Sequence, residues 1–357
     1  MVQKIELGLD SFGDVTADPD GQLLPQAQVI RNVVEEAALA EEVGVYVIGL
    51  GEHHRPDFAI SCPEVVLAAI ASRTKRIALA SSATVLSSDD PIRVFERFST
   101  LNAASSGRAE VILGRGSFTE SFPLFGYSLS DYEALFDEKL NLFAAILKND
   151  AVTWQGHTRL PLTNQRIFPP IENGTLKTWI GVGGSPQSVI RAAHYDLPLM
   201  LAIIGGDPNR FRPYVDLYHR AFAQSRPVRE IGVHSHSYVA EIDDTAREEL
   251  WPLQKDARSH RRRARLVADD TRRIRFRDRT RFALCRLAAD CRAAYRNDGK
   301  IAWCLPLPHE IQRRHAVTRK DHALYRALWT EGHPHGAGDG GVKRFSPVER
   351  RRHSGGI

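Results

Sequence analysis

The sequence predicts an α/β fold, specifically a (β/α)8 barrel, from two observations. Short apolar runs of strand length alternate seven times with longer segments in which apolar residues recur at helical spacing. This alternation occupies residues 1–257, close to the length of about 250 residues that is usual for such a barrel. Strands joined by crossover helices pair in parallel, so their carboxyl ends should meet at one mouth.

Each predicted element rests on an apolar run or on a helix signal. The first strand is expected at 5–9 and its helix at 26–43, and the second strand is the apolar run 45–48. Asp90 and Pro91 are typical of an N-cap and a first helical position, so a helix should begin there. The remaining strands are expected at 76–86, 109–113, 178–182, 199–202 and 231–235, and the remaining helices at 63–73, 132–147, 186–195, 211–224 and from 245 onward.

The charge balance changes at about residue 257. Residues 1–257 hold 23 Lys+Arg against 33 Asp+Glu, whereas residues 258–357 hold 25 against 10, and 22 of those 25 are arginine. No convincing strand is visible in the second part. We therefore expect a (β/α)8-barrel domain in 1–257 and a poorly ordered, arginine-rich tail in 258–357, with the last β/α unit lost. A nucleic-acid-binding arm is disfavoured, because the arginines carry no regular interleaving of aromatic residues and no known motif is present.

Composition also excludes several other classes of protein. No run of 18 apolar residues occurs, so no transmembrane helix is expected. Residues 1–6 lack the apolar core of a signal peptide. Four cysteines without paired spacing argue against a disulfide scaffold or a zinc site. We expect a cytoplasmic protein with no metal and with neither nucleic acid nor membrane as a partner.

A carboxylate and two imidazoles, Glu52, His53 and His54, stand at the carboxyl end of the second strand. Burying such groups unpaired is costly, and ligands of α/β folds bind at the carboxyl ends of strands. The triplet is therefore a candidate site. On this motif alone, a structural histidine pair with satisfied hydrogen bonds is an equal alternative.

A glycine-rich loop follows the fifth strand. Gly183 and Gly184 allow close backbone approach, and Ser185 is expected to cap a helix that begins at Pro186, with Ser188 one turn on. Free amides at a helix N-terminus and serine hydroxyls together make an anion site. The alternative is an ordinary glycine-rich turn with a serine cap.

Arg115 stands between two glycines at the end of the fourth strand. Its guanidinium could bind phosphate in a bidentate manner, and the alternative is a surface salt bridge. The chain has neither a Walker lysine loop nor a strand–GxGxxG–helix unit. The anion site therefore points to a phosphorylated cofactor in a barrel, and away from nucleoside triphosphates and the dinucleotide-binding fold.

Four motifs keep one order and spacing between residues 3 and 255. They are Glu52-His53-His54, Ala83-Thr84-Val85-Leu86-Ser87-Ser88-Asp89-Asp90-Pro91, Gly114-Arg115-Gly116-Ser117 with Phe125-Gly126, and Gly181-Val182-Gly183-Gly184-Ser185-Pro186. Each is weak alone, but together they are specific. In these motifs the chain resembles the bacterial luciferase-like, flavin-dependent monooxygenases.

The resemblance implies a role for individual residues. His53 matches the catalytic histidine of the family, and Glu52 matches a carboxylate near the isoalloxazine ring. Ser82 and Ala83 match a strained, often cis, peptide bond that packs on the flavin. The other implied cofactor contacts are Thr84 in the same motif, Ser117 beside the ring, and Arg115, Gly183, Gly184, Ser185 and Ser188 at the phosphate.

The resemblance further implies reduced FMN as cofactor, supplied by a separate flavin reductase, and O2 with a small organic substrate. A homodimer is implied as well. A deazaflavin- or NAD(P)H-linked oxidoreductase is the alternative within the family, and an inactive flavin-binding remnant is the alternative outside it. Substrate choice is expected to depend on the loops 118–131 and 150–177.

We interpret the tail as an out-of-frame translation that begins between residues 252 and 258. Shifted by one nucleotide, the codons of 260–272, 283–289 and 309–328 can encode segments that look like the C-terminal region of this family, in the right order. Without an eighth strand, the first and seventh strands would keep unpaired edges and the barrel would stay open.

Overall fold

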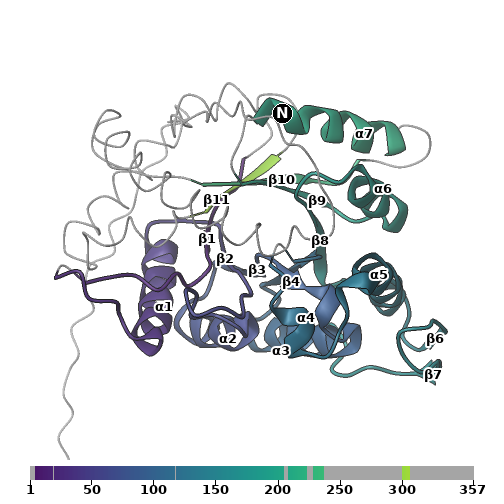
Figure 1. Cartoon of the computed structure of the whole chain (residues 1–357), viewed down its shortest axis with the longest axis horizontal. Helices are drawn as coiled ribbons and strands as arrows, with labels where there is room; N and C mark the ends of the chain where they lie inside the picture. The colour runs from purple at the N-terminus through teal and green to yellow at the C-terminus, as the bar shows by residue number, and fades with distance from the viewer. Residues whose placement is uncertain are drawn as a thin grey trace, which may run out of the picture.

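The computed structural model describes residues 5–18, 20–116, 118–204, 208–222, 228–236 and 300–305. Its main sheet is parallel, with the strands in the order β3-β2-β1-β11-β10-β9-β8-β5 (Figure 1). A further pairing of β3 with β5 closes this sheet into a ring. The predicted (β/α)8 barrel is therefore confirmed.

The elements follow the predicted order closely. The strands of the ring are β1 Leu7–Ser11, β2 Val47–Leu50, β3 Ala78–Ser81, β5 Ala109–Gly114, β8 Lys177–Val182, β9 Leu199–Ile203, β10 Ile231–His236 and β11 Lys300–Leu305, and β4 Thr84–Val85 extends the pairing along β5. The helices are α1 Gln26–Glu42, α2 Pro63–Arg73, α3 Pro91–Ala104, α4 Ser121–Leu124, α5 Tyr132–Lys148, α6 Pro186–Tyr195 and α7 Arg212–Phe222, with 3-10 turns at Leu86–Ser88, Leu129–Asp131 and Pro208–Phe211.

The start of α3 agrees with the local sequence signals. The Asp90 carboxylate accepts hydrogen bonds from the backbone amides of Ile92 (2.9 Å) and Arg93 (3.2 Å), and Pro91 takes the first helical position. The predicted N-cap is therefore confirmed. None of the described helices is long and apolar enough to cross a membrane.

The expectation that residues 258–357 supply no strand was wrong. Strand β11 lies between β1 and β10, with Trp303 opposite both Gly8 and His234. Its sequence, Lys-Ile-Ala-Trp-Cys-Leu, is an apolar run with strand-forming Ile and Trp, and Pro306 follows it. The arginine-rich composition around this run concealed it. The helix expected from residue 245 and the rest of the tail lie outside the described residues.

Two apolar layers hold the barrel together. Outside the ring, the large side chains of α2, α3 and α5, such as Leu67, Phe98 and Phe143, are fully buried against the strands. Inside the ring, Trp179 and Met200 belong to a smaller cluster of inward-facing residues. This inner cluster fills part of the barrel, and a cavity lies beside its members Ile112 and Met200.

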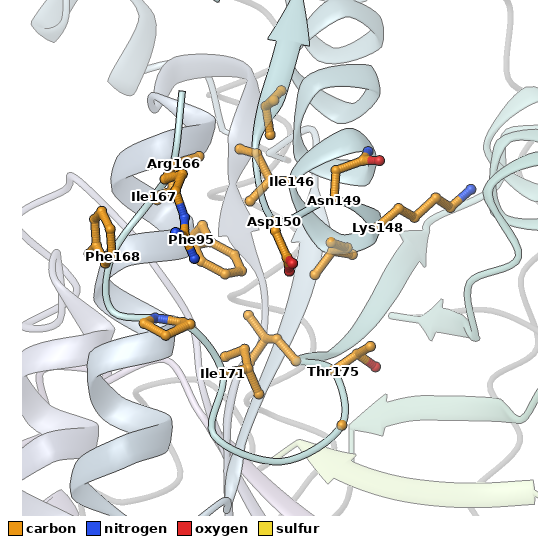
Figure 2. Close-up of a pocket in the computed structure, with 15 residues that line it drawn as sticks. Phe95, Ile146, Lys148, Asn149, Asp150, Arg166, Ile167, Phe168, Ile171 and Thr175 are labelled. Carbon is orange, nitrogen blue, oxygen red and sulfur yellow. The ribbon is translucent and has the colours of Figure 1, made fainter. Parts of the chain in front are cut away.

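The segment 150–177 contains a small sheet of its own. It forms the antiparallel pair β6 Val152–Trp154 and β7 Leu162–Gln165. Part of it lines a pocket of about 180 Å³, together with Phe95 and the end of α5 (Figure 2). Arg159, in the same segment, pairs with Asp90, the N-cap of α3, at 3.1 Å. Because α3 follows β4 at the carboxyl ends of the strands, this contact brings part of the segment to the side of the mouth, and its role in substrate choice stays a prediction.

Candidate active site

A cavity of about 420 Å³ lies at the carboxyl ends of the barrel strands. It brings together residues from the loops after β2, β3, β5 and β8 with residues of β9 and β10. The predicted residues that line it are Glu52, His53, Ser82, Ala83, Arg115, Gly183, Gly184 and Ser185. Residues far apart in the sequence thus meet at one mouth.

His53 lies in an aromatic cage on the wall of this cavity. Its ring centroid is 4.3 Å from that of Phe58, 5.0 Å from Phe12 and 5.1 Å from Phe118. Burial among these rings lowers the pKa of His53 to about 4. Its Nε2 is buried and has no hydrogen-bond partner among the described residues. His53 therefore presents a neutral imidazole that can exchange a hydrogen bond or a proton with a ligand.

Glu52 and His54 form the satisfied pair that the sequence left open as an alternative. Glu52 Oε1 is 2.9 Å from Nε2 of His54, and its Oε2 accepts a hydrogen bond from the Val85 amide at 2.8 Å. This carboxylate ties the loop after β2 to the segment after β3. The two histidines of the motif thus differ, since His54 is held by protein and His53 faces the cavity.

The segment after β3 lies between these loops and the barrel interior. The peptide bond between Ser82 and Ala83 is cis, as the resemblance implies, and both residues line the cavity. Thr84, in contrast, is fully buried and donates a hydrogen bond to Oγ of Ser81 at 2.9 Å. Thr84 is not among the lining residues, so its structural role is internal to the loop.

The glycine loop leads into α6 as predicted, but its cap differs from the prediction. Helix α6 begins at Pro186, and Ser185 occupies the N-cap position without a side-chain capping bond. The Ser185 hydroxyl donates instead to Oε1 of Gln187 at 3.0 Å, and the Ser188 amide donates to the Ser185 carbonyl at 3.2 Å. Ser188 is buried and is not among the lining residues. The first-turn amides are thus not claimed by the Ser185 side chain.

The geometry of the loop leaves room for an anion. Gly184 has φ +133°, a conformation that disfavours other residues, and a Cβ on Gly183 would meet no atom within 4 Å. The open space therefore lies directly beside the backbone of the loop. This is the arrangement that helix N-termini use to bind phosphate.

Arg115 forms the salt bridge that the sequence left open as the alternative, and its binding of phosphate stays a prediction. It lines the cavity, and its guanidinium pairs with the exposed Glu133 and lies 5.4 Å from the centroid of the Tyr132 ring. Gly116, with φ +80°, follows it, and a Cβ there would approach Val85 to 2.8 Å. The glycine therefore permits the tight turn that exposes Arg115 to the cavity. Ser117 lies outside the described residues.

Sequence reasoning missed several lining residues. Phe12 and Phe118 complete the cage, and Glu120 pairs with Arg55 at 2.5 Å across the loops after β2 and β5. His234, on β10, also lines the cavity. It stands within the predicted strand 231–235, so the rule that identified Glu52 and His53, polar residues directly after a strand, did not select it. In the part of the chain that the structure describes, no cluster of three or more His, Cys, Asp or Glu residues could hold a metal.

Comparison with known families gives a match over most of the chain. The family model described as luciferase-like monooxygenase matches residues 12–345. The N-acetyl-S-alkylcysteine monooxygenase of Bacillus subtilis is 30% identical over 180 residues, which are 49% of this chain and 52% of the relative. The alkanal monooxygenase alpha chain of Photorhabdus luminescens is 25% identical over 243 residues, 65% of this chain and 64% of the relative. The first relatives are matched over only about half of their length, 51% and 46%.

Solved structures show the same fold at low identity. The monooxygenase RslO1 from Streptomyces bottropensis has a TM-score of 0.69 at 20% identity, and the alignment covers 92% of this chain and 98% of RslO1. The oxygenating constituent of 3,6-diketocamphane monooxygenase from Pseudomonas putida, in complex with FMN, has a TM-score of 0.58 at 18% identity, with 68% and 70% covered. An F420-dependent secondary alcohol dehydrogenase has a TM-score of 0.65 at 16% identity, with 93% and 100% covered.

Proposed function

Because the chain belongs to the luciferase-like monooxygenase family, we propose that it oxidises a small organic substrate with O2 and reduced FMN. The observation that carries the proposal is the cavity itself. It joins a desolvated, neutral His53 to a glycine loop and an arginine suited to phosphate. A flavin mononucleotide has an anionic end and an apolar ring, and the cavity offers a matching environment for each.

The phosphate end would lie at the loop before α6. Backbone amides at a helix N-terminus carry partial positive charge, and Arg115 adds a full charge on the same side of the cavity. Binding a phosphate there would compete with Glu133 for the guanidinium. Because the Glu133 side chain is exposed, loss of its ion pair with Arg115 costs little free energy.

The ring end would lie between the segment containing Ser82 and Ala83 and the cage around His53. Small lining residues, Ala83, Gly114 and Gly181, leave the space that a flat ring system needs. Ile112 and Met200 supply an apolar base for it. The residues present therefore fit an FMN-sized cofactor.

Bound reduced flavin would supply the electrons that O2 chemistry requires, and the protein would control protons and water. His53, neutral at physiological pH, can accept or donate a proton at Nε2. Phe12, Phe58 and Phe118 shield this nitrogen from water and would pack against an apolar substrate. Arg55 bridges Asp57 and Glu120, so it ties two of the loops that carry the cage.

The proposal is tested with the purified full chain, a flavin reductase, NAD(P)H and FMN. We expect NAD(P)H-dependent oxygenation that requires both free FMN and the reductase, and that is lost when F420 replaces FMN. Activity with reduced F420 and none with FMN would establish the deazaflavin alternative instead. Turnover with NAD(P)H alone, without flavin, would contradict both. We also propose a homodimer in the cytoplasm, which size-exclusion chromatography and fractionation test.

The out-of-frame interpretation of the tail stays a proposal with its own test. Strand β11 removes one argument for an inactive remnant, because the barrel closes with residues 300–305 in place. Resequencing the coding DNA across codons 245–265 decides the remainder. A missing or extra base would support the frame shift, and an intact frame would make the arginine-rich segment part of the native protein.

A further inference from the structure

A second polar cluster lies inside the barrel and shares no residue with the cage. Asp10 comes from β1, Ser82 from the end of β3, and His234 from β10. His234 Nδ1 lies 3.1 Å from Oδ2 of Asp10 and 3.2 Å from Oγ of Ser82. Three separate strands thus place an acid, a hydroxyl and an imidazole in mutual contact, and both Ser82 and His234 line the cavity.

Burial of these polar groups is unfavourable for the stability of the fold. Asp10 is fully buried and His234 is 5% exposed. Burial raises the pKa of Asp10 well above its usual range, although the neighbouring Ser82 hydroxyl acts to lower it. Burial also lowers the pKa of His234 to about 3, so the imidazole is neutral. Burial of such groups is costly, and titratable groups with perturbed pKa values that border a cavity are candidates for a ligand site.

Another polar group in the barrel interior, Glu110, provides a contrast. Glu110 is buried too, but Lys177 lies 3.2 Å from its Oε1 and the Trp179 indole donates to its Oε2 at 2.8 Å. That carboxylate is satisfied by its neighbours, and neither Glu110 nor Lys177 lines the cavity. The Asp10 cluster differs because it reaches the cavity through His234.

We propose that His234 binds the polar edge of the ring system held in the cavity through its Nε2, and that Asp10 and Ser82 position its imidazole through Nδ1. The inference rests on the proposed function and concerns the ring end of the flavin. A flavin ring carries alternating carbonyl and N–H groups along one edge, which a neutral imidazole can recognise by hydrogen bonding. This contact would lie away from the phosphate end at Arg115 and the glycine loop.

The two ring nitrogens allow the proposal to be separated from a purely structural role. In His234→Gln the side-chain amide reaches approximately the position of Nε2, whereas in His234→Asn it reaches approximately that of Nδ1. A ligand contact through Nε2 is retained better by Gln. A role limited to satisfying Asp10 through Nδ1 is retained better by Asn.

The experiment measures dissociation constants for FMN and for riboflavin, which lacks the phosphate, by quenching of flavin fluorescence with the full chain. We expect His234→Asn to raise the dissociation constants of both flavins by about tenfold, which corresponds to the loss of roughly one good hydrogen bond. The dissociation constants of His234→Gln should stay within about threefold of those of the wild type. Asp10→Asn should raise the dissociation constants of FMN and riboflavin by the same factor, because Asp10 acts through the His234 imidazole. The midpoint potential of bound FMN should shift in His234→Asn and not in His234→Gln.

The outcomes distinguish this inference from the proposed function. If the wild type binds neither flavin nor F420, the proposed function fails. If the wild type binds FMN but His234→Asn binds as tightly as His234→Gln, with unchanged potential, the role of His234 is overturned. Circular dichroism of each variant shows whether it is folded, and the comparison of Asn with Gln holds between folded variants alone.

Discussion

The cavity has a neutral histidine in the aromatic cage around His53, which we call the wall, and another in the cluster of Asp10, Ser82 and His234, which we call the floor, but the two are held in opposite ways. On the wall, His53 is surrounded by three phenylalanine rings, and its Nε2 has no hydrogen-bond partner among the described residues. On the floor, His234 is fixed by Asp10 and Ser82. An imidazole in an apolar cage is free to exchange a proton, whereas one fixed by polar neighbours is suited to hold a ligand in place.

This difference suggests a division of labour within one cavity. The wall belongs to loops after β2 and β5, which can vary without disturbing the barrel. The floor belongs to the strands themselves, whose positions are set by the closed ring. Chemistry and substrate choice would therefore reside in the wall, and cofactor placement in the floor and the phosphate loop.

The largest expected effect is the loss of the wall histidine. His53→Ala should lower the oxygenation rate by about 10² to 10⁴, the usual contribution of a general acid or base, and should leave the FMN dissociation constant unchanged. Steady-state kinetics with a coupled reductase measures the rate. His194→Ala, at an exposed position on α6, is the matched control and should retain full activity. Turnover that survives in His53→Ala would refute the catalytic assignment.

Substitution of Arg115, the arginine proposed to bind the phosphate, should weaken FMN binding and leave the wall around His53 intact. Arg115→Ala should weaken FMN by about tenfold, because a charge-assisted contact is lost, and should leave riboflavin binding unchanged. Arg93→Ala is the control, since Arg93 is exposed on α3 and pairs with Glu96. Equal effects on FMN and riboflavin would remove Arg115 from the phosphate site.

The two histidines should also differ in how stability depends on pH. The folded pKa of His53 is about 4, below its ordinary value near 6.5, so the unfolded chain binds a proton that the folded chain does not. The free energy of unfolding should therefore fall as pH drops from about 6.5 towards 4, by up to ~1.4 kcal/mol per pH unit from this residue. His53→Phe should remove this part of the slope in urea unfolding at pH 7, 6 and 5.

On the floor, a neighbouring acid opposes the histidine. The raised pKa of Asp10 lets the folded chain bind a proton as pH falls, which stabilises it, while the lowered pKa of His234 has the opposite sign. As pH drops, the free energy of unfolding should therefore fall less steeply in His234→Phe than in the wild type, and more steeply in Asp10→Asn, as urea unfolding at pH 7, 6 and 5 measures. An equal slope in these two variants would show that the two groups do not oppose each other.

The smallest expected effect comes from trimming the cage. Phe118→Ala should raise KM for an apolar substrate by about two- to tenfold, because one aromatic contact is lost, and should leave FMN binding unchanged. Phe168→Ala is the control, since Phe168 lies by the distant pocket of Figure 2 and is 60% exposed. A KM that does not respond to Phe118→Ala would place the substrate elsewhere in the cavity.

The sequence predicted the elements of the wall well and the floor poorly. Glu52, His53 and Arg115 stand directly after recognisable strands, so the rule that strand ends converge was sufficient. Asp10 and His234 stand within strands that look apolar overall, and only the closed ring shows that both face inward. Their contact depends on the barrel's shear, which no local pattern records.

The remaining differences have local causes. The capping role expected for Ser185 failed because its hydroxyl found Gln187, two residues away. Thr84 shares a motif with Ala83 but lies on the buried side of its turn. Strand β11 was overlooked because composition was weighed over a long segment, while a strand needs only six suitable residues. Local competition and segment averaging thus account for these errors.

A crystal structure of the full chain with FMN tests the central claim most directly. The account predicts the phosphate at Gly183, Gly184 and Arg115, with the ring between the wall at His53 and the floor at His234. A flavin bound with its phosphate elsewhere, or with its ring remote from His53, would contradict the assignment of this cavity as the active site.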